Sequence, residues 1–279
     1  MRSRLTPLIA VLLSTPAAPV LWAAPPTPFR IVLDPGHGGG DQGTVYSNHA
    51  VRVAEKDATL KIAMEAARQL RAQGIEVILT RQSDREVPLG DRTALANRVK
   101  ANLFLSIHLN SPPPILKDFS HARAGASAEG VETYILNTAN EDSSRRLARL
   151  ENSVLGGSPD RTEGQTTEVA LILKDLRLDA NLSESKRLAC LIQNHVTQDR
   201  GPGSDRGVRQ ALFHVLLGAD MPSALLEAGF LSSAKDRSQV VSPAGRKRLG
   251  KAITQAVVAF KQGQGLSLPY PALSRCKVR

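Results

Sequence analysis

Two histidines and a glutamate occupy positions from which they could share one metal ion. His37 follows the apolar run 29–34, and His108 lies at the end of the apolar run 103–108. Glu55 opens a segment in which apolar residues recur at helical spacing. Sites in α/β proteins form beyond the carboxyl ends of the sheet strands, so these three side chains can meet at one rim. Two imidazoles and one carboxylate match an open catalytic zinc site, in which water holds the fourth position.

Glu227 is the candidate proton carrier that such a site requires. Zinc lowers the pKa of a bound water from ~15.7 towards ~7, but a base must accept the proton and deliver it to the leaving group. Glu227 ends the apolar stretch SALLE, where an acid is costly unless it is functional or paired. Taken alone, each of the four residues has an ordinary structural explanation, such as a glutamate at a helix N-terminus. Their joint placement favours the site.

The remaining histidines lack this placement, and no H-E-x-x-H sequence, the metalloprotease signature of a helix, occurs in the chain. We expect these histidines to be structural or surface residues. They are His49, His121, His195 and His214.

The glycine-rich loop around His37 also fits a nucleotide-binding pattern. Three of its glycines match G-x-G-x-x-G after an expected strand, which alone is weak evidence. A dinucleotide site needs a helix that starts within the glycines and points its N-terminus at the phosphate, whereas helical spacing here begins only near Glu55. No Lys-Ser/Thr pair follows Gly43, as a P-loop requires. We therefore interpret the glycines as a turn that aims the imidazole and leaves room beside the metal.

Strand-length apolar runs alternate with helical segments, which predicts an α/β fold. We expect a single domain with a mixed, mostly parallel sheet of about six strands flanked by helices. Helices are expected after Glu55, from Asp91, and over Leu249 to Phe260. The expected strands are FRIVLD, EVILT, LFLSIHL, VETYIL, ALFHVLL and SALLEAGF.

The first residues have the layout of a secretory signal: two arginines, an apolar stretch broken by prolines, and small residues. The apolar stretch is shorter than the roughly 20 residues of a membrane-spanning helix. We expect a signal peptide at 1–23, a linker at 24–28 and a catalytic domain at 29–262, with an insertion of regulatory character at 140–181. Residues 263–279 read as a flexible basic tail.

Charge and cysteine content narrow the function classes only slightly. The net charge of +10 favours anionic polymers, which outside the cytoplasm include cell-wall glycans, teichoic acids and lipopolysaccharide. Aromatic residues make up 4% of the chain and do not alternate with Lys or Arg, so the stacking platforms of single-stranded nucleic-acid binders are missing. Cys190 reads as a small core residue, and a disulfide with Cys276 stays open at this point.

Five long blocks of the chain occur in a characteristic order: IVLDPGHGGGDQGT, EKDATLKIA, VILTRQSDREVPLGDRTALANRVKANLFLSIHLNS, GVETYIL and RGVRQALFHVLLGADMPSALLEAGFLSSAKD. Together they resemble the zinc-dependent N-acetylmuramoyl-L-alanine amidases of bacterial cell-wall turnover. The resemblance implies that His37, Glu55 and His108 bind one zinc ion and that Glu227 acts in catalysis. It also implies hydrolysis of the amide that joins N-acetylmuramic acid to the L-alanine of the peptidoglycan stem peptide.

The insertion at 140–181 resembles the segment that covers the zinc in Gram-negative cell-division amidases until a protein activator displaces it. The stretch SSRRLARLENSVLGG is similar to the start of that segment. The resemblance implies autoinhibition with Glu151 as an extra metal contact, a protein activator, and the periplasm of a Gram-negative bacterium. A helix that simply packs on the sheet is the alternative.

Three other functions stay open beside the amidase. A catalytically inactive wall-binding module is disfavoured by the intact set of His37, Glu55, His108 and Glu227. A different zinc hydrolase, such as a peptidase or deacetylase, would use the same ligand types, so only the family blocks disfavour it. A basic nucleic-acid binder is disfavoured by the export signal and by the absence of a recognition motif.

Overall fold

The computed structural model describes residues 28–110, 128–139, 141–153, 166–201 and 203–263, together with Cys276 and Val278. For residues 166–180 it describes the backbone alone. The expected signal peptide, the linker up to residue 27 and most of the tail lie outside these residues. None of the described helices has the combination of length and hydropathy that crossing a membrane requires.

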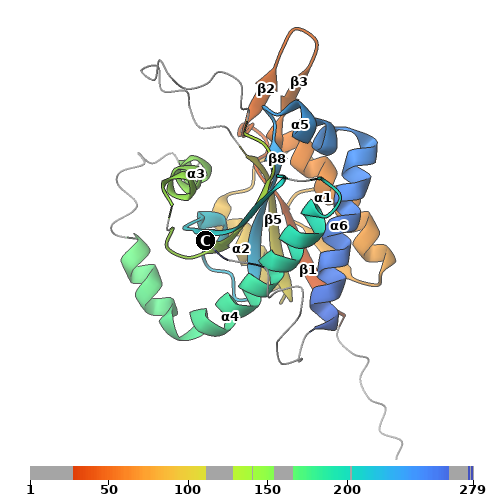
Figure 1. Cartoon of the computed structure of the whole chain (residues 1–279). Coiled ribbons are helices and arrows are strands. Elements are labelled where there is room, and N and C mark those ends of the chain that lie inside the picture. The colour runs from red at the N-terminus through yellow and green to blue at the C-terminus, as the bar shows by residue number, and fades with distance from the viewer. Residues whose placement is uncertain are drawn as a thin grey trace, which may run out of the picture.

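A six-stranded sheet forms the centre of the molecule, with helices on both faces (Figure 1). Its order is β4-β1-β5-β8-β6-β7. Only the β6–β8 pair is antiparallel among the described pairs of this sheet, so the expected mixed, mostly parallel sheet is confirmed. The strands are β1 (Arg30–Pro35), β4 (Glu76–Leu79), β5 (Leu103–Asn110), β6 (Val131–Leu136), β7 (Asp205–Ala211) and β8 (Ser223–Phe230).

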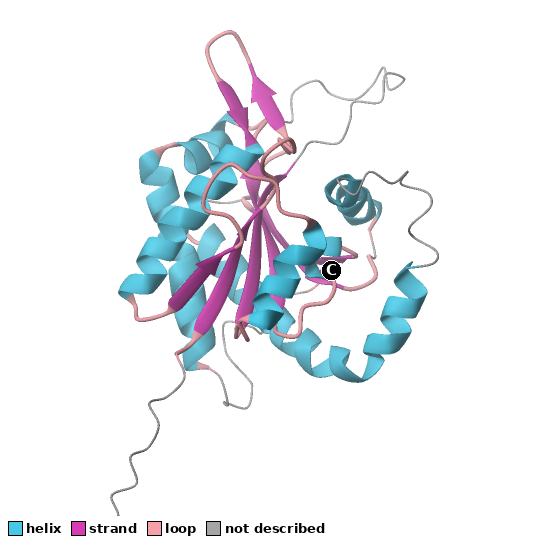
Figure 2. Cartoon of the chain, turned by 180° about the vertical axis from the view of Figure 1, so that it is seen from behind, coloured by secondary structure: helices cyan, strands magenta, loops and turns pink. Residues whose placement is uncertain are grey.

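Two core layers follow from the alternation of side chains along buried strands. Ile31 and Leu33 of β1 face α1, α4 and α6, while Val32 between them faces the layer that includes α2, α3 and η2. Figure 2 shows the helices on either side of the sheet. The helices are α1 (Glu55–Ala72), α2 (Leu89–Arg98), α3 (Asp142–Asn152), α4 (Thr166–Thr197), η2 (His214–Leu216), α5 (Ala234–Val241) and α6 (Pro243–Gln262).

The strand expected at ALFHVLL is wrong. β7 ends at Ala211, and the apolar residues after it form the short 3-10 helix η2. Phe213, Val215 and Leu216 are apolar because they pack in the second core layer, not because they are in a sheet. β7 is an edge strand with exposed and half-buried positions, so its sequence DRGVRQA carries no continuous apolar run.

The end of the expected insertion and the expected tail also differ from what the structure shows. α4 runs without a break through residue 181, so the expected end of the insertion falls inside a helix. Cys190 of α4 is buried, as expected for a core residue, and forms a disulfide with Cys276. Val278 makes a parallel bridge with Val208 of β7. The described tail residues are therefore fastened to the sheet edge and α4, not loose.

A small β-hairpin projects beside the rim where the carboxyl ends of β1 and β5 lie (Figure 1). It consists of β2 (Val45–Ser47) and β3 (Arg52–Ala54). The loop that carries His37 leads into β2, and Glu55 follows β3 directly. The hairpin is therefore part of the chain segment that connects two candidate ligands.

Candidate metal centre

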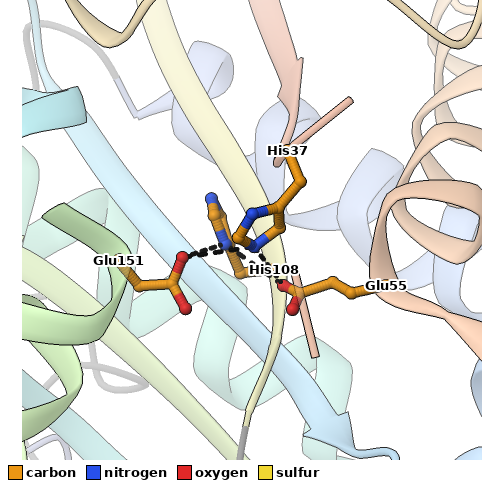
Figure 3. A group of neighbouring side chains, drawn as sticks. All are labelled: His37, Glu55, His108 and Glu151. Atoms are coloured by element: carbon orange, nitrogen blue, oxygen red, sulfur yellow. Dashed lines mark ion pairs between the residues drawn. The ribbon is translucent and has the colours of Figure 1, made fainter. Parts of the chain in front are cut away.

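Four side chains from different elements converge at the rim of the sheet (Figure 3). His37 comes from the loop after β1, Glu55 from the first position of α1 and His108 from β5. Glu151, near the C-terminal end of α3, completes the group. One ligand atom from each residue lies within 4.8 Å of those of the other three. The structure thus brings together the three expected metal ligands and the expected extra contact.

The spacing of these atoms fits a small cation at their centre. His37 Nε2 lies 3.1 Å from Glu55 Oε1 and 3.2 Å from Glu151 Oε2. His108 Nδ1 lies 3.2 Å and 3.0 Å from the same two oxygens. Ligands about 2.0 Å from a tetrahedral zinc ion are about 3.3 Å apart. The two ring nitrogens and the Glu151 oxygen are buried and make no hydrogen bond to a described residue, as expected for atoms that ligate a metal.

His37 is held in place by its own backbone and by Asp41. Its φ of 60° lies in the left-handed region, which is uncommon for a residue other than glycine. Asp41 Oδ2 lies 2.7 Å from His37 Nδ1, which leaves Nε2 to face the cluster. Asp41 was not among the expected site residues; its signal in the sequence is a carboxylate four residues after the histidine in the same loop.

A buried ion pair beneath the loop fixes where His37 stands. Asp34 of β1 lies 2.8 Å from Arg92 of α2, and both side chains are buried. Arg92 also donates to the carbonyl oxygens of Pro35 and His37. Because one guanidinium holds both the strand end and the loop, the position of the imidazole is coupled to the packing of α2.

Glu55 is oriented by two backbone amides. Thr44 N–H donates to Oε2 at 2.8 Å and Leu109 N–H donates to Oε1 at 2.7 Å. Gly43 provides the room, since a Cβ there would lie 2.5 Å from the His37 ring and 2.6 Å from Glu55 Oε2. The φ of Gly43 is +59°. This glycine is therefore required both for the turn and for the approach of the two ligands.

The electrostatics of the cluster favour positive charge at its centre. Burial lowers the pKa of His37, yet the neighbouring carboxylates, Glu55 foremost, outweigh it and raise that pKa above its usual value. Burial acts on His108 in the same sense, but Glu151 and Glu55 raise its pKa to about 10. Burial raises the pKa of Glu55, but the two imidazoles outweigh it and hold that pKa below its usual value. A metal cation and protons would therefore compete for the same nitrogen atoms.

Glu227 lies beside the cluster on β8. It is paired in register with His108, so both side chains project from the same face of the sheet. The Glu227 side chain is fully buried, and neither carboxylate oxygen has a hydrogen-bond partner among the described residues. Burial, with the nearby charge of Glu151, raises the pKa of Glu227 well above its usual value. A buried acid that prefers its protonated form is suited to carrying a proton.

The histidines expected outside the site do not join the cluster, as far as the structure describes them. His49 is exposed in the turn of the hairpin, and His195 and His214 are half-buried on α4 and η2. His121 lies outside the described residues.

Comparison with known proteins identifies the family to which this site belongs. The family model described as N-acetylmuramoyl-L-alanine amidase matches residues 31–259. The chain belongs to this amidase family. The match extends from β1 to the last helix and includes all four residues of the cluster and Glu227.

Individual relatives of the amidase family agree with this assignment. The N-acetylmuramoyl-L-alanine amidase AmiC of Neisseria meningitidis is 33% identical over 240 residues, which cover 82% of this chain and 52% of that protein. The chain thus spans about half of that relative's length. AmiA of Escherichia coli is 27% identical, with 82% and 75% covered.

Solved structures of the family share the fold. An N-acetylmuramoyl-L-alanine amidase from Clostridium difficile 630 is 27% identical with a TM-score of 0.59, covering 85% of this chain and 99% of that one. The amidase AmiC2 of Nostoc punctiforme is 26% identical with a TM-score of 0.58, covering 84% and 97%.

Proposed function

We propose that this chain hydrolyses the amide bond between N-acetylmuramic acid and the L-alanine of peptidoglycan stem peptides, using one zinc ion. The observation that carries the proposal is the convergence of His37, Glu55 and His108 next to Glu227, which is buried and has no hydrogen-bond partner among the described residues. Membership of the amidase family supports the choice of substrate over that of a peptidase or deacetylase.

The proposed roles follow from the contacts of each residue. His37, Glu55 and His108 would hold the metal, and Asp41 fixes the ring of His37. When bound, zinc would supply a Lewis acid for the scissile carbonyl and lower the pKa of water. Glu227 takes the proton of the attacking water and gives it to the leaving amine of L-alanine. Its raised pKa and its burial beside His108 support this role.

The proposed cellular setting is the cell wall outside the cytoplasm. The basic chain with its expected signal peptide would be exported, in a Gram-negative bacterium to the periplasm, and would act in wall remodelling or daughter-cell separation.

Digestion of purified sacculi by the mature protein tests the activity directly. We expect release of peptides that begin with L-alanine, blocked by a chelator and restored by added Zn²⁺. The matched control is Glu227→Gln, which keeps the shape of the side chain but can neither take up nor release the proton. Glycan fragments or cuts within the peptide would contradict the proposal.

We also propose that α3 inhibits the enzyme and that a protein activator displaces it. Glu151 places a carboxylate against both imidazoles, where a water molecule or the substrate would approach. Asn152 anchors the end of α3 by accepting from His214 N–H and donating to the Leu212 carbonyl. Arg209 of β7 pairs with Glu141 at the other end of the helix. Contacts at both ends and few buried side chains between them suit a helix that can lift away.

A further inference from the structure

A cavity of about 220 Å³ lies beside the metal cluster at the same rim of the sheet. Asn110, two positions after His108 on β5, lines it, as does Glu132, the partner of Glu227 in the β6–β8 register. Residues of α3, including Arg146, line the cavity as well. If α3 lifts away, the groups on the sheet remain as an open groove that leads from the cluster.

The cationic group on the sheet side of the cavity is the guanidinium of Arg206. Its Nε donates to Glu132 Oε1 at 2.7 Å, and its Cζ lies 5.2 Å from the centre of the Phe230 ring. The two terminal nitrogens make no hydrogen bond or ion pair within the described part of the chain. The side chain is 34% exposed, so these donors are accessible from the cavity.

The carboxylate that holds Arg206 has no capacity left for a ligand. Glu132 Oε2 accepts from Asn110 Nδ2 at 2.7 Å and from the Tyr134 hydroxyl at 2.8 Å. Glu132 Oε1 is shared between Arg206 and Arg209, whose Nε lies at 3.4 Å. The negative charge in the cavity wall is therefore compensated, and the open donors of Arg206 favour an anion.

The backbone makes room for this arginine. A Cβ on Gly130 would lie 3.0 Å from both Cγ and Cδ of Arg206 and 2.7 Å from the Ser204 carbonyl oxygen. The φ of Gly130 is +107°, a conformation that a larger residue rarely adopts. The path of the Arg206 side chain thus depends on Gly130, the residue directly before β6.

The distance from the cluster suggests which part of the substrate reaches Arg206. The guanidinium contacts Glu132 on β6, two strands from His108 on β5. Neighbouring strands are about 4.8 Å apart, which gives roughly 10 Å. An extended peptide advances about 3.3–3.6 Å per residue, so this span corresponds to two or three residues.

We propose that Arg206 is a specificity-determining residue that binds a carboxylate of the leaving peptide, two to three residues beyond the cleaved amide. This inference rests on the proposed amidase function. Arg206 binds the carboxylate through its two terminal nitrogens, in the paired geometry that guanidinium and carboxylate groups favour.

The test compares muramyl peptides that differ only in one carboxylate. One pair of substrates carries a carboxylate or a carboxamide on the second stem residue, and another pair carries this difference on the third. The full mature chain with Glu151→Gln is used throughout, to exclude blocking by α3. We expect the carboxylate form of at least one pair to have a kcat/KM about tenfold higher. The difference should lie mainly in KM, because the contact is remote from the cleaved bond.

Variants on the two walls of the cavity separate this contact from general charge. Arg206→Gln should bring the ratio of kcat/KM for the carboxylate form to kcat/KM for the carboxamide form to about one. Arg146→Gln, which removes the same charge from the α3 wall, should preserve this ratio. Equal loss in both variants would overturn the assignment to Arg206. If Arg206→Gln fails to fold, the substrate pairs still decide, since equal cleavage of both forms in both pairs would overturn the inference alone. Cleavage of neither form would overturn the proposed function and this inference with it.

Discussion

Replacing Glu151 by glutamine tests whether α3 holds the enzyme closed. The Glu151 carboxylate lies 3.2 Å from His37 Nε2 and 3.0 Å from His108 Nδ1. An interaction with a charged group contributes about 1.5–3 kcal/mol, and we take about 3 kcal/mol for the interaction of the Glu151 carboxylate with the positive centre of the cluster. Since about 1.4 kcal/mol corresponds to a factor of ten, the population of molecules in which α3 has moved away from the cluster could rise about 100-fold. Glutamine keeps an oxygen in place, and we therefore expect an increase of about 10- to 100-fold in kcat/KM.

Release of soluble peptide from dye-labelled sacculi, without any activator, measures this increase. Asp142→Asn is the matched control, because it removes the same charge from the same helix at a side chain that is 91% exposed. Unchanged activity in Glu151→Gln would refute the inhibitory role of this contact. Lower activity would instead make Glu151 a part of the catalytic machinery.

Three further predictions concern the proton carrier, the support of the loop and the tail. Glu227→Gln should abolish turnover while one metal per chain remains in elemental analysis; loss of the metal would make Glu227 a ligand. Arg92→Met leaves the buried carboxylate of Asp34 without its ion-pair partner and should lower the free energy of unfolding in urea by about 3–5 kcal/mol. Arg98→Met, at an exposed position of the same helix, should leave this free energy nearly unchanged. Reducing the Cys190–Cys276 disulfide should lower the same quantity by up to about 4.6 kcal/mol, because the bond joins residues 86 positions apart. Equal urea midpoints with and without reductant would contradict this account.

The sequence predicted most of the sheet because buried strands carry continuous apolar runs. β1, β4, β5, β6 and β8 all coincide with such runs. β7 was not predicted because an edge strand is only partly buried, and its sequence therefore contains polar residues in place of a continuous apolar run. The apolar residues of η2 took its place in the prediction, because burial against neighbouring elements produces the same local pattern as burial in a sheet.

The candidate site was predictable to the extent that its residues follow recognisable elements. His37, Glu55, His108 and Glu227 stand at the ends of strands or at the start of a helix, and the fold brings such ends to one rim. Asp41 was not recognised, because a loop aspartate has many ordinary uses and only its 2.7 Å contact with His37 reveals this one.

The sequence by itself determined the family, the α/β class and the kinds of side chain that face the reaction, since these depend on local spacing and residue type. Only the tertiary structure decided which distant residues touch. It set β8 between β5 and β6, and thereby placed Glu227 next to both His108 and Glu132. It also joined Cys190 to Cys276 and aimed Arg206 into the cavity. Such contacts depend on strand order and register, and no short stretch of sequence specifies either of them.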